Sequence, residues 1–174
     1  MFNRKKSNRL LILGLALAGL GWYANAEAKK EIYIDKPAFR LYVVEETDTI
    51  VSYPVCLAEN LGQKKRAGDH KTPEGDFSIV SMEPASGWTH KGKDGKVKKG
   101  VYGPWFFRLK CPQSTHIGIH GTDRPETIGT RDSEGCIRLH NEDLLQLKEH
   151  IYIGMPVHIS SESGFPKTED NSEE

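Results

Sequence analysis

Short apolar segments with alternating side chains recur along the chain and are separated by turn residues. In such segments every second side chain lies on the same face, as in a half-buried β-strand. The pattern is clear at residues 31–36, 38–44, 49–58, 76–82, 115–119 and 157–159. Glycine, proline and aspartate lie between many of these segments and favour turns. The sequence therefore predicts an all-β or β-rich fold, as two packed sheets or a flattened barrel.

A single strong helix pattern follows residue 140. Asn141 is a candidate N-cap, and the two acidic residues after it suit the positive end of a helix dipole. Leu144, Leu147 and Ile151 recur at helical spacing and form a narrow apolar stripe. We expect one short helix whose stripe packs across a sheet.

One histidine and one cysteine are the candidates for catalysis. His120 ends the alternating segment at 115–119, and a turn-rich loop leads from it to Cys136, which begins a second apolar run. A path of strand, loop and strand can return the cysteine beside the histidine. A thiol reacts as its thiolate, and an adjacent imidazole can take the proton and hold the ion pair.

Neighbouring residues could complete such a site. Gly135 precedes the cysteine, so its backbone N–H and that of Cys136 are candidates for an oxyanion hole. The imidazole also needs an orienting partner. Asp123, Asp132 and the backbone carbonyl of Gly121 are all candidates, and spacing does not choose among them.

The stretch from His120 to Arg138 resembles the signature of the L,D-transpeptidase catalytic domain, the YkuD-like family. That signature is His-Gly, a loop of similar length, and then Ser-x-Gly-Cys-x-Arg. Weaker similarities at residues 71–77 and 103–109 extend the likeness over about residues 31–159. The resemblance implies a YkuD-like β-sandwich of mixed sheets, with the site at one end and one short helix after the cysteine.

The resemblance also implies roles for particular residues. Cys136 would be the nucleophile, His120 the base, and the carbonyl of Gly121 the partner that orients the ring. Arg138 is either a substrate contact or a structural ion-pair partner, and Tyr102 is either a wall of the site or part of the core. We expect three side chains to contact the substrate: Arg138, Ser133 and Tyr102.

An enzyme of this family would act on peptidoglycan stem peptides without a metal, nucleotide or other cofactor. The Cys136 thiolate would attack the carbonyl before a terminal D-amino acid, release that amino acid and leave a thioester. The acceptor would then decide the product. An amine of a neighbouring stem would give a 3-3 cross-link, and a lysine of an envelope protein would anchor that protein. Water would give a carboxypeptidase product. Carbapenems are expected to acylate the same cysteine. Glu134 departs from the histidine that many members carry, which bears on acceptor or leaving-group chemistry.

The first 26 residues have the features of a secretory signal peptide. Four basic residues precede the apolar run Leu10–Leu20, and Ala24-Asn25-Ala26 is a small-x-small cleavage signal. The run is short for a membrane span, and an uncleaved anchor is the alternative. We expect an exported protein of the periplasm or cell envelope, with the catalytic domain at residues 27–159 and a disordered polar tail at residues 160–174.

The charge of the chain argues against a nucleic-acid partner. It has 24 basic and 24 acidic residues, and four basic ones lie in the predicted leader, so 20 remain against 24 for a net charge of −4. Nucleic-acid binders show a basic surplus along one face. Residues 91–99 are rich in lysine around an Asp-Gly pair, which predicts a hairpin turn that is either simply solvated or meets an anionic polymer. We expect a monomer.

Cysteine and histidine usage leaves three alternatives open. Cys56 and Cys111 could form a disulfide, or they could be separate buried thiols. The chain could also be a catalytically silent module that binds cell-wall peptide. Finally, four residues could hold zinc, although their spacing is not a standard zinc signature: His116, His120, Cys136 and His140.

Overall fold

The structure is a computed structural model and describes residues 29–92 and 94–163. The predicted signal peptide and most of the predicted polar tail lie outside the described residues. Within the described ranges, no helix is long and apolar enough to cross a membrane.

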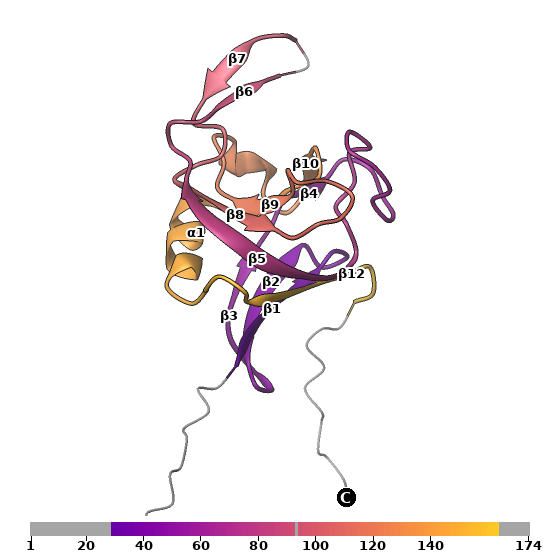
Figure 1. Ribbon diagram of the computed structural model, residues 1–174, viewed down its shortest axis with the longest axis vertical. Coiled ribbons are helices and arrows are strands. Elements are labelled where there is room, and N and C mark those ends of the chain that lie inside the picture. Colours follow the sequence, from indigo (N-terminus) through magenta and orange to yellow (C-terminus); the bar gives the residue numbers. More distant parts are fainter. Residues whose placement is uncertain (1–28, 93, 164–174) are drawn as a thin grey trace, which may run out of the picture.

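The described part of the chain consists mainly of short strands, with one α-helix and one 3-10 helix (Figure 1). The first strands are β1 (Lys30–Asp35), β2 (Arg40–Glu45), β3 (Asp48–Pro54), β4 (Leu57–Ala58), β5 (Gly75–Pro84), β6 (Thr89–Lys91) and β7 (Val97–Lys99). The remaining elements are β8 (Trp105–Leu109), β9 (Gly118–His120), η1 (Pro125–Thr127), β10 (Arg131–Ser133), β11 (Ile137–Arg138), α1 (Asn141–Lys148) and β12 (Pro156–Ser160).

Eight of the strands form one curled, mixed sheet in the order β11-β9-β8-β5-β12-β1-β2-β3. Two neighbouring pairs are parallel, β1 with β12 and β11 with β9, and the other pairs are antiparallel. The long strand β5 pairs with β12 along its first half and with β8 along its second half, with a register shift between Ile79 and Ser81. The sheet therefore divides into two halves that share β5 (Figure 1).

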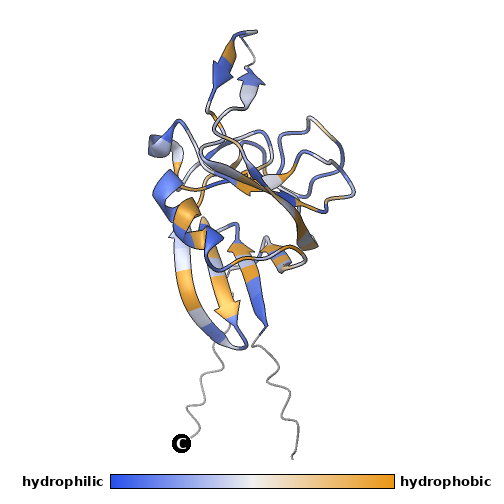
Figure 2. Cartoon of the chain, turned by 60° about the vertical axis from the view of Figure 1, so that its left-hand side comes forward, coloured by the Kyte–Doolittle hydropathy of each residue, from blue (hydrophilic) through white to orange (hydrophobic). Residues whose placement is uncertain are grey.

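A hydrophobic core joins the two halves of the sheet. It combines Ile32 and Leu41 from β1 and β2 with Phe107 and Ile119 from β8 and β9. Figure 2 shows the hydrophobic and hydrophilic residues alternating along the strands, as expected when one face is buried. The predicted β-rich fold of mixed sheets with one short helix is confirmed.

The helix packs as predicted but begins differently. Leu144, Leu147 and Ile151 are buried, so the predicted apolar stripe is confirmed. The predicted N-cap is wrong, because the cap position is His140 and Asn141 is the first helical residue. The Asn141 amide instead holds the backbone of Thr122, with Oδ1 accepting its N–H at 2.9 Å and Nδ2 donating to its carbonyl at 3.1 Å. A tertiary contact has replaced the local cap.

The disulfide alternative for Cys56 and Cys111 is wrong, and both are separate buried thiols. Cys56 exchanges two backbone hydrogen bonds with Arg138, at 2.8 and 3.0 Å, while the Cys111 thiol donates to Gln113 Oε1 at 3.2 Å. The two cysteines therefore belong to separate parts of the fold and have different hydrogen-bond partners.

Two further segments bear on the site. The strand before His120 is shorter than predicted, because β9 begins at Gly118 and His116 lies ahead of it in an exposed position. The lysine-rich run pairs with the residues before it as the hairpin of β6 and β7, which confirms the predicted turn. Figure 1 shows this hairpin extending away from the body of the molecule.

Candidate active site

Neighbouring strands position the candidate nucleophile and base. In the parallel pair of β9 and β11, His120 is the register partner of Arg138, and Ile119 is the partner of Ile137. Cys136 directly precedes β11, two residues before Arg138, so its side chain is on the same side of the strand as that of Arg138. The predicted path of strand, loop and strand thus brings the cysteine to the strand next to His120.

His120 is held rigidly in the floor of the site. Its side chain is buried, its ring stacks on Phe106 with centroids 5.3 Å apart, and the edge of Tyr102 meets it at 5.0 Å. Nδ1 lies 2.7 Å from the carbonyl oxygen of Gly121. A carbonyl only accepts, so Nδ1 must carry the hydrogen and Nε2 is left with the lone pair. The ring is therefore set in the tautomer that a base needs.

Burial keeps this imidazole neutral. It lowers the pKa of His120 to about 3, with a further lowering from the charge of Arg138 and an opposing effect from the hydrogen bond to Gly121. A charged imidazole is disfavoured when it loses contact with water. The floor of the site thus holds a neutral base at neutral pH.

The backbone that orients His120 is itself clamped by the start of α1. Asn141 bonds both backbone groups of Thr122, the residue after Gly121. A Cβ on Gly121 would overlap Asn141 Oδ1 and come within 3.0 Å of the Gly103 backbone, so only glycine fits here. The sequence pattern predicted Asn141 as a helix cap and gave no sign of this role, because only tertiary packing brings its amide to the loop.

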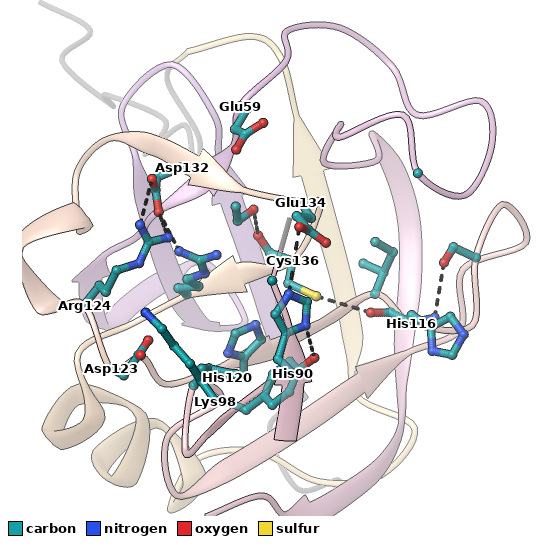
Figure 3. Close-up of a pocket in the computed structure, with 18 of the residues that line it drawn as sticks. Glu59, His90, Lys98, His116, His120, Asp123, Arg124, Asp132, Glu134 and Cys136 are labelled. Carbon is teal, nitrogen blue, oxygen red and sulfur yellow. Dashed lines mark hydrogen bonds and ion pairs between the residues drawn. The ribbon is translucent and has the colours of Figure 1, made fainter. Parts of the chain in front are cut away.

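The Cys136 thiol rests as a neutral group. Its Sγ–H donates to the carbonyl of His116 at 3.2 Å (Figure 3). Burial raises the pKa of the Cys136 thiol to about 11, against the opposing effects of a hydrogen bond from the Gly118 backbone and the charge of Arg138. Both pKa shifts favour a neutral thiol and a neutral imidazole at rest over the ion pair considered from the sequence. Such a pair would transfer its proton as the sulfur attacks a substrate.

Gly135 makes the turn that presents the cysteine. Its φ is +145°, and a Cβ there would lie 2.9 Å from Ile117 Cδ1 and 3.1 Å from the Lys71 carbonyl oxygen. The Ser133 hydroxyl closes the turn by donating to the Cys136 carbonyl at 2.6 Å and accepting the Gly135 N–H at 3.2 Å. The oxyanion role of the Gly135 and Cys136 N–H groups stays a prediction, as does substrate contact by Ser133.

Arg138 makes the structural ion pair that was one of its two predicted roles. Its Nη1 lies 2.8 Å from Asp132 Oδ2, and Arg124 pairs with both oxygens of the same carboxylate. Arg138 also lines the pocket around Cys136, so substrate contact stays a prediction. Asp132 is held by two arginines and Asp123 is exposed, and the partner seen on the His120 ring is the Gly121 carbonyl.

A pocket of about 700 Å³ opens above this floor. Cys136, His120 and Tyr102 line it, which places the aromatic ring at the wall of the site rather than in the core. Lys96 and Lys98 bring the β6–β7 hairpin to the same pocket. The hairpin is therefore part of the candidate site.

His90 is a pocket residue that sequence analysis missed. It lies on β6, where its Nδ1 is 3.1 Å from the Tyr102 hydroxyl and its Nε2 is 3.9 Å from Glu134 Oε1 (Figure 3). No motif contains it, because the hairpin brings it to the site from outside the stretch 120–138. Only the contacts of His90 with Tyr102 and Glu134 in the folded chain reveal its place at the site, and one sequence does not show such contacts.

The metal alternative finds no support in the geometry. Among residues 29–92 and 94–163 there is no group of three or more His, Cys, Asp or Glu side chains that could hold a metal ion. The Cys136 thiol bonds a carbonyl, and His120 Nδ1 does the same. The four histidine and cysteine residues considered from the sequence are therefore not assembled as one ligand set.

Comparison with known families decides how this site is classified. The family model of the L,D-transpeptidase catalytic domain, YkuD, matches residues 29–159, which are most of the chain. This chain belongs to the L,D-transpeptidase family. The match covers β1 to β11, α1 and all but the last residue of β12, and so includes the candidate pair and the β6–β7 hairpin.

Curated relatives agree with this L,D-transpeptidase assignment, and solved structures share the fold. The YkuD protein of Bacillus licheniformis is 35% identical over 122 residues, which cover 70% of this chain and 58% of that protein. An L,D-transpeptidase from Mycobacterium smegmatis has the same fold, with a TM-score of 0.60, 16% identity and coverage of 77% of this chain and 59% of that one. An L,D-transpeptidase in complex with imipenem has a TM-score of 0.55 and 17% identity, covering 75% and 58% of the two chains. The chain spans about half the length of the curated relatives it matches.

Proposed function

We propose that this protein is a cysteine-dependent L,D-transpeptidase that acts on peptidoglycan stem peptides. The observation that carries the proposal is the fixed tautomer of His120, whose Nδ1–H is bound to Gly121 beside the strand that presents Cys136. This arrangement leaves Nε2 as the acceptor for a thiol proton. Membership of the family supplies the class of substrate.

The acylation step follows from these two groups. Nε2 of His120 takes the Sγ proton of Cys136 as the sulfur attacks the carbonyl carbon before the terminal D-amino acid. The C–S bond forms, the C–N bond breaks, and the proton passes from His120 to the leaving nitrogen. The products are a Cys136 thioester and a free D-amino acid. Backbone N–H groups of Gly135 and Cys136 are the proposed donors to the oxyanion.

The thioester is then transferred to an acceptor. An amine of a neighbouring stem gives a 3-3 cross-link, and an amine of a protein lysine anchors that protein. Hydrolysis of the thioester gives L,D-carboxypeptidase activity on the same fold. We propose export to the periplasm or cell envelope, where stem peptides are found, on the basis of the leader-like residues 1–26.

Carbapenems are proposed to acylate Cys136 as well. A carbapenem carries an activated acyl group that the same thiol can open. A family member of the same fold is known in complex with imipenem.

Intact-mass spectrometry of the protein with a disaccharide tetrapeptide tests the proposal, with Cys136→Ala in parallel. We expect a mass gain on the wild type alone, equal to the acyl donor less one D-amino acid, together with release of that amino acid. A mass gain on Cys136→Ala would overturn the assignment of the nucleophile. Absence of any adduct or released D-amino acid would overturn the substrate class.

A further inference from the structure

Transfer to an amine poses a proton problem that transfer to water does not. A primary alkyl amine arrives as an ammonium, since its pKa is about 10.4. Two protons must leave its nitrogen before an amide can form and the thiol can be restored. One of them returns to the Cys136 sulfur through His120, and the other needs a second acceptor. Water needs no second acceptor, because the carboxylic acid product ionises by itself.

The rim of the pocket has a pair of groups that suits this task. His90 and Glu134 both line the same pocket as Cys136 and His120. The side chain of His90 is 35% exposed and that of Glu134 is 47% exposed, so both can exchange protons with solvent. Neither takes part in the acylation step described above.

The orientation of His90 is set by Tyr102. Burial raises the pKa of Tyr102, and the nearby Cys136 and Glu134 raise it further, so the phenol keeps its proton. The Tyr102 hydroxyl lies 3.1 Å from His90 Nδ1 and can either accept its hydrogen or donate to it. Nε2 lies 3.9 Å from Glu134 Oε1 (Figure 3), and it has a free lone pair in the tautomer in which Nδ1 carries the hydrogen. A proton taken by Nε2 would give an imidazolium that the carboxylate stabilises.

We propose that Glu134 and His90 form an acceptor subsite for primary amines, in which Glu134 binds the ammonium and His90 accepts its first proton. This inference rests on the proposed function. The ammonium nitrogen loses one proton to His90 Nε2 and attacks the thioester carbonyl carbon. The C–N bond forms and the C–S bond breaks, and the second proton passes through His120 to the Cys136 sulfur. His90 then returns its proton to solvent.

The subsite also defines the kind of acceptor. A carboxylate at the rim attracts a cationic amine more strongly than a neutral nucleophile, to which it offers a hydrogen bond but no charge attraction. Competition between amine and water for one acyl-enzyme therefore depends on these two side chains. The third participant, Tyr102, is a positioning residue that holds the His90 ring.

The test measures how the acyl-enzyme is partitioned. The full chain is incubated with a disaccharide tetrapeptide and with one of two nucleophiles: Nα-acetyl-lysine, which arrives as an ammonium, or hydroxylamine, which is neutral near neutral pH. The amounts of amide, hydroxamate and hydrolysed product give the ratio of each transfer to hydrolysis. Any loss in acylation cancels in these ratios.

We expect His90→Gln to lower the ratio of acetyl-lysine transfer to hydrolysis by about 100-fold, the scale of general base catalysis. The ratio for hydroxylamine should stay the same. Glu134→Gln should raise the KM for acetyl-lysine by about fivefold, the scale of one exposed ion pair, with the same selectivity between nucleophiles. Because Glu134 is exposed, we expect Glu134→Gln to leave the stability of the fold nearly unchanged.

A matched control comes from another histidine between carboxylates. His158 lies 2.6 Å from Asp76 Oδ1 and 3.1 Å from Glu31 Oε2, and it lines a separate pocket. His158→Gln should leave both ratios at the wild-type values.

Three outcomes would overturn the inference. Equal losses for acetyl-lysine and hydroxylamine would make His90 a purely structural residue, and unchanged ratios in both variants would exclude the subsite. A wild type that forms no thioester by intact mass would remove the proposed function and this inference with it. A thioester with unchanged ratios removes the inference alone.

Discussion

The floor and the rim of the pocket are built on different principles. On the floor, His120 is 3% exposed, packed between aromatic rings and fixed to a backbone carbonyl. At the rim, His90 is partly exposed and Glu134 is exposed, and a hairpin extending from the body presents His90. The difference teaches that one pocket can hold a buried imidazole whose protonation is suppressed and an open one that exchanges protons with water.

The two environments suit the two halves of the proposed reaction. Acylation moves one proton between groups inside the site, which favours a fixed and dry geometry. Transfer to an amine must export a proton, which favours a group in contact with solvent. If this division is right, the groups on the floor keep their protons from solvent, whereas those at the rim exchange protons with it.

The largest expected effect comes from the base on the floor. His120→Gln should lower the rate of thioester formation by about 100-fold or more, because the thiol loses its proton acceptor. Intact-mass spectrometry of samples quenched at successive times measures this rate. A rate near that of the wild type would mean that another group accepts the proton.

The next effect concerns the reactivity of the cysteine in the free enzyme. With burial raising the pKa of Cys136 to about 11 instead of the ordinary 9.0, the thiolate fraction at pH 8 is about 100-fold below that of an ordinary thiol. Alkylation by iodoacetamide, followed by peptide mass mapping, should therefore keep rising between pH 8 and pH 10. A plateau near neutral pH would reveal a preformed ion pair on the floor.

A smaller effect is expected on stability in acid. The unfolded chain binds a proton at His120 below its ordinary pKa of 6.5, whereas the folded chain binds it only near a pKa of about 3. Stability therefore falls as the pH falls through this window, by about 2 to 3 kcal/mol between pH 6.5 and pH 4.5. Urea unfolding of the wild type and His120→Asn at both pH values measures it. Equal pH dependence in the two proteins would contradict the buried neutral histidine.

The smallest effect compares one glycine of each region. Gly135→Ala combines a φ of +145° with a Cβ 3.1 Å from a backbone oxygen and should destabilise the fold by about 1 to 3 kcal/mol. Gly95→Ala, on the hairpin, has a φ of +77° but open space around the new Cβ. We expect a smaller loss for Gly95→Ala in thermal unfolding. A larger loss for the hairpin variant would mean that the rim is as tightly packed as the floor.

Much of the fold could be predicted from local pattern. Alternating segments predicted the strands because a half-buried strand imposes a period of two, and the leucine spacing predicted the buried face of α1. Local pattern gave a wrong prediction where a residue distant in sequence, rather than a neighbour, bonded the side chain. Asn141 looked like a helix cap, but its amide bonds the Thr122 backbone. The curled sheet that shares β5 depends on a register shift that no single segment reveals.

The sequence by itself determined the candidate pair, since Cys136 and His120 stand in one contiguous motif, and it determined the β-rich class through its periodicity. Only the tertiary structure decided the environment of that pair. Burial favoured the neutral resting forms of thiol and imidazole. Packing brought His90 to the pocket and Asn141 to the Thr122 backbone beside Gly121. The physical reason is that desolvation and contact depend on which surfaces meet in three dimensions, and one linear motif does not specify its neighbours.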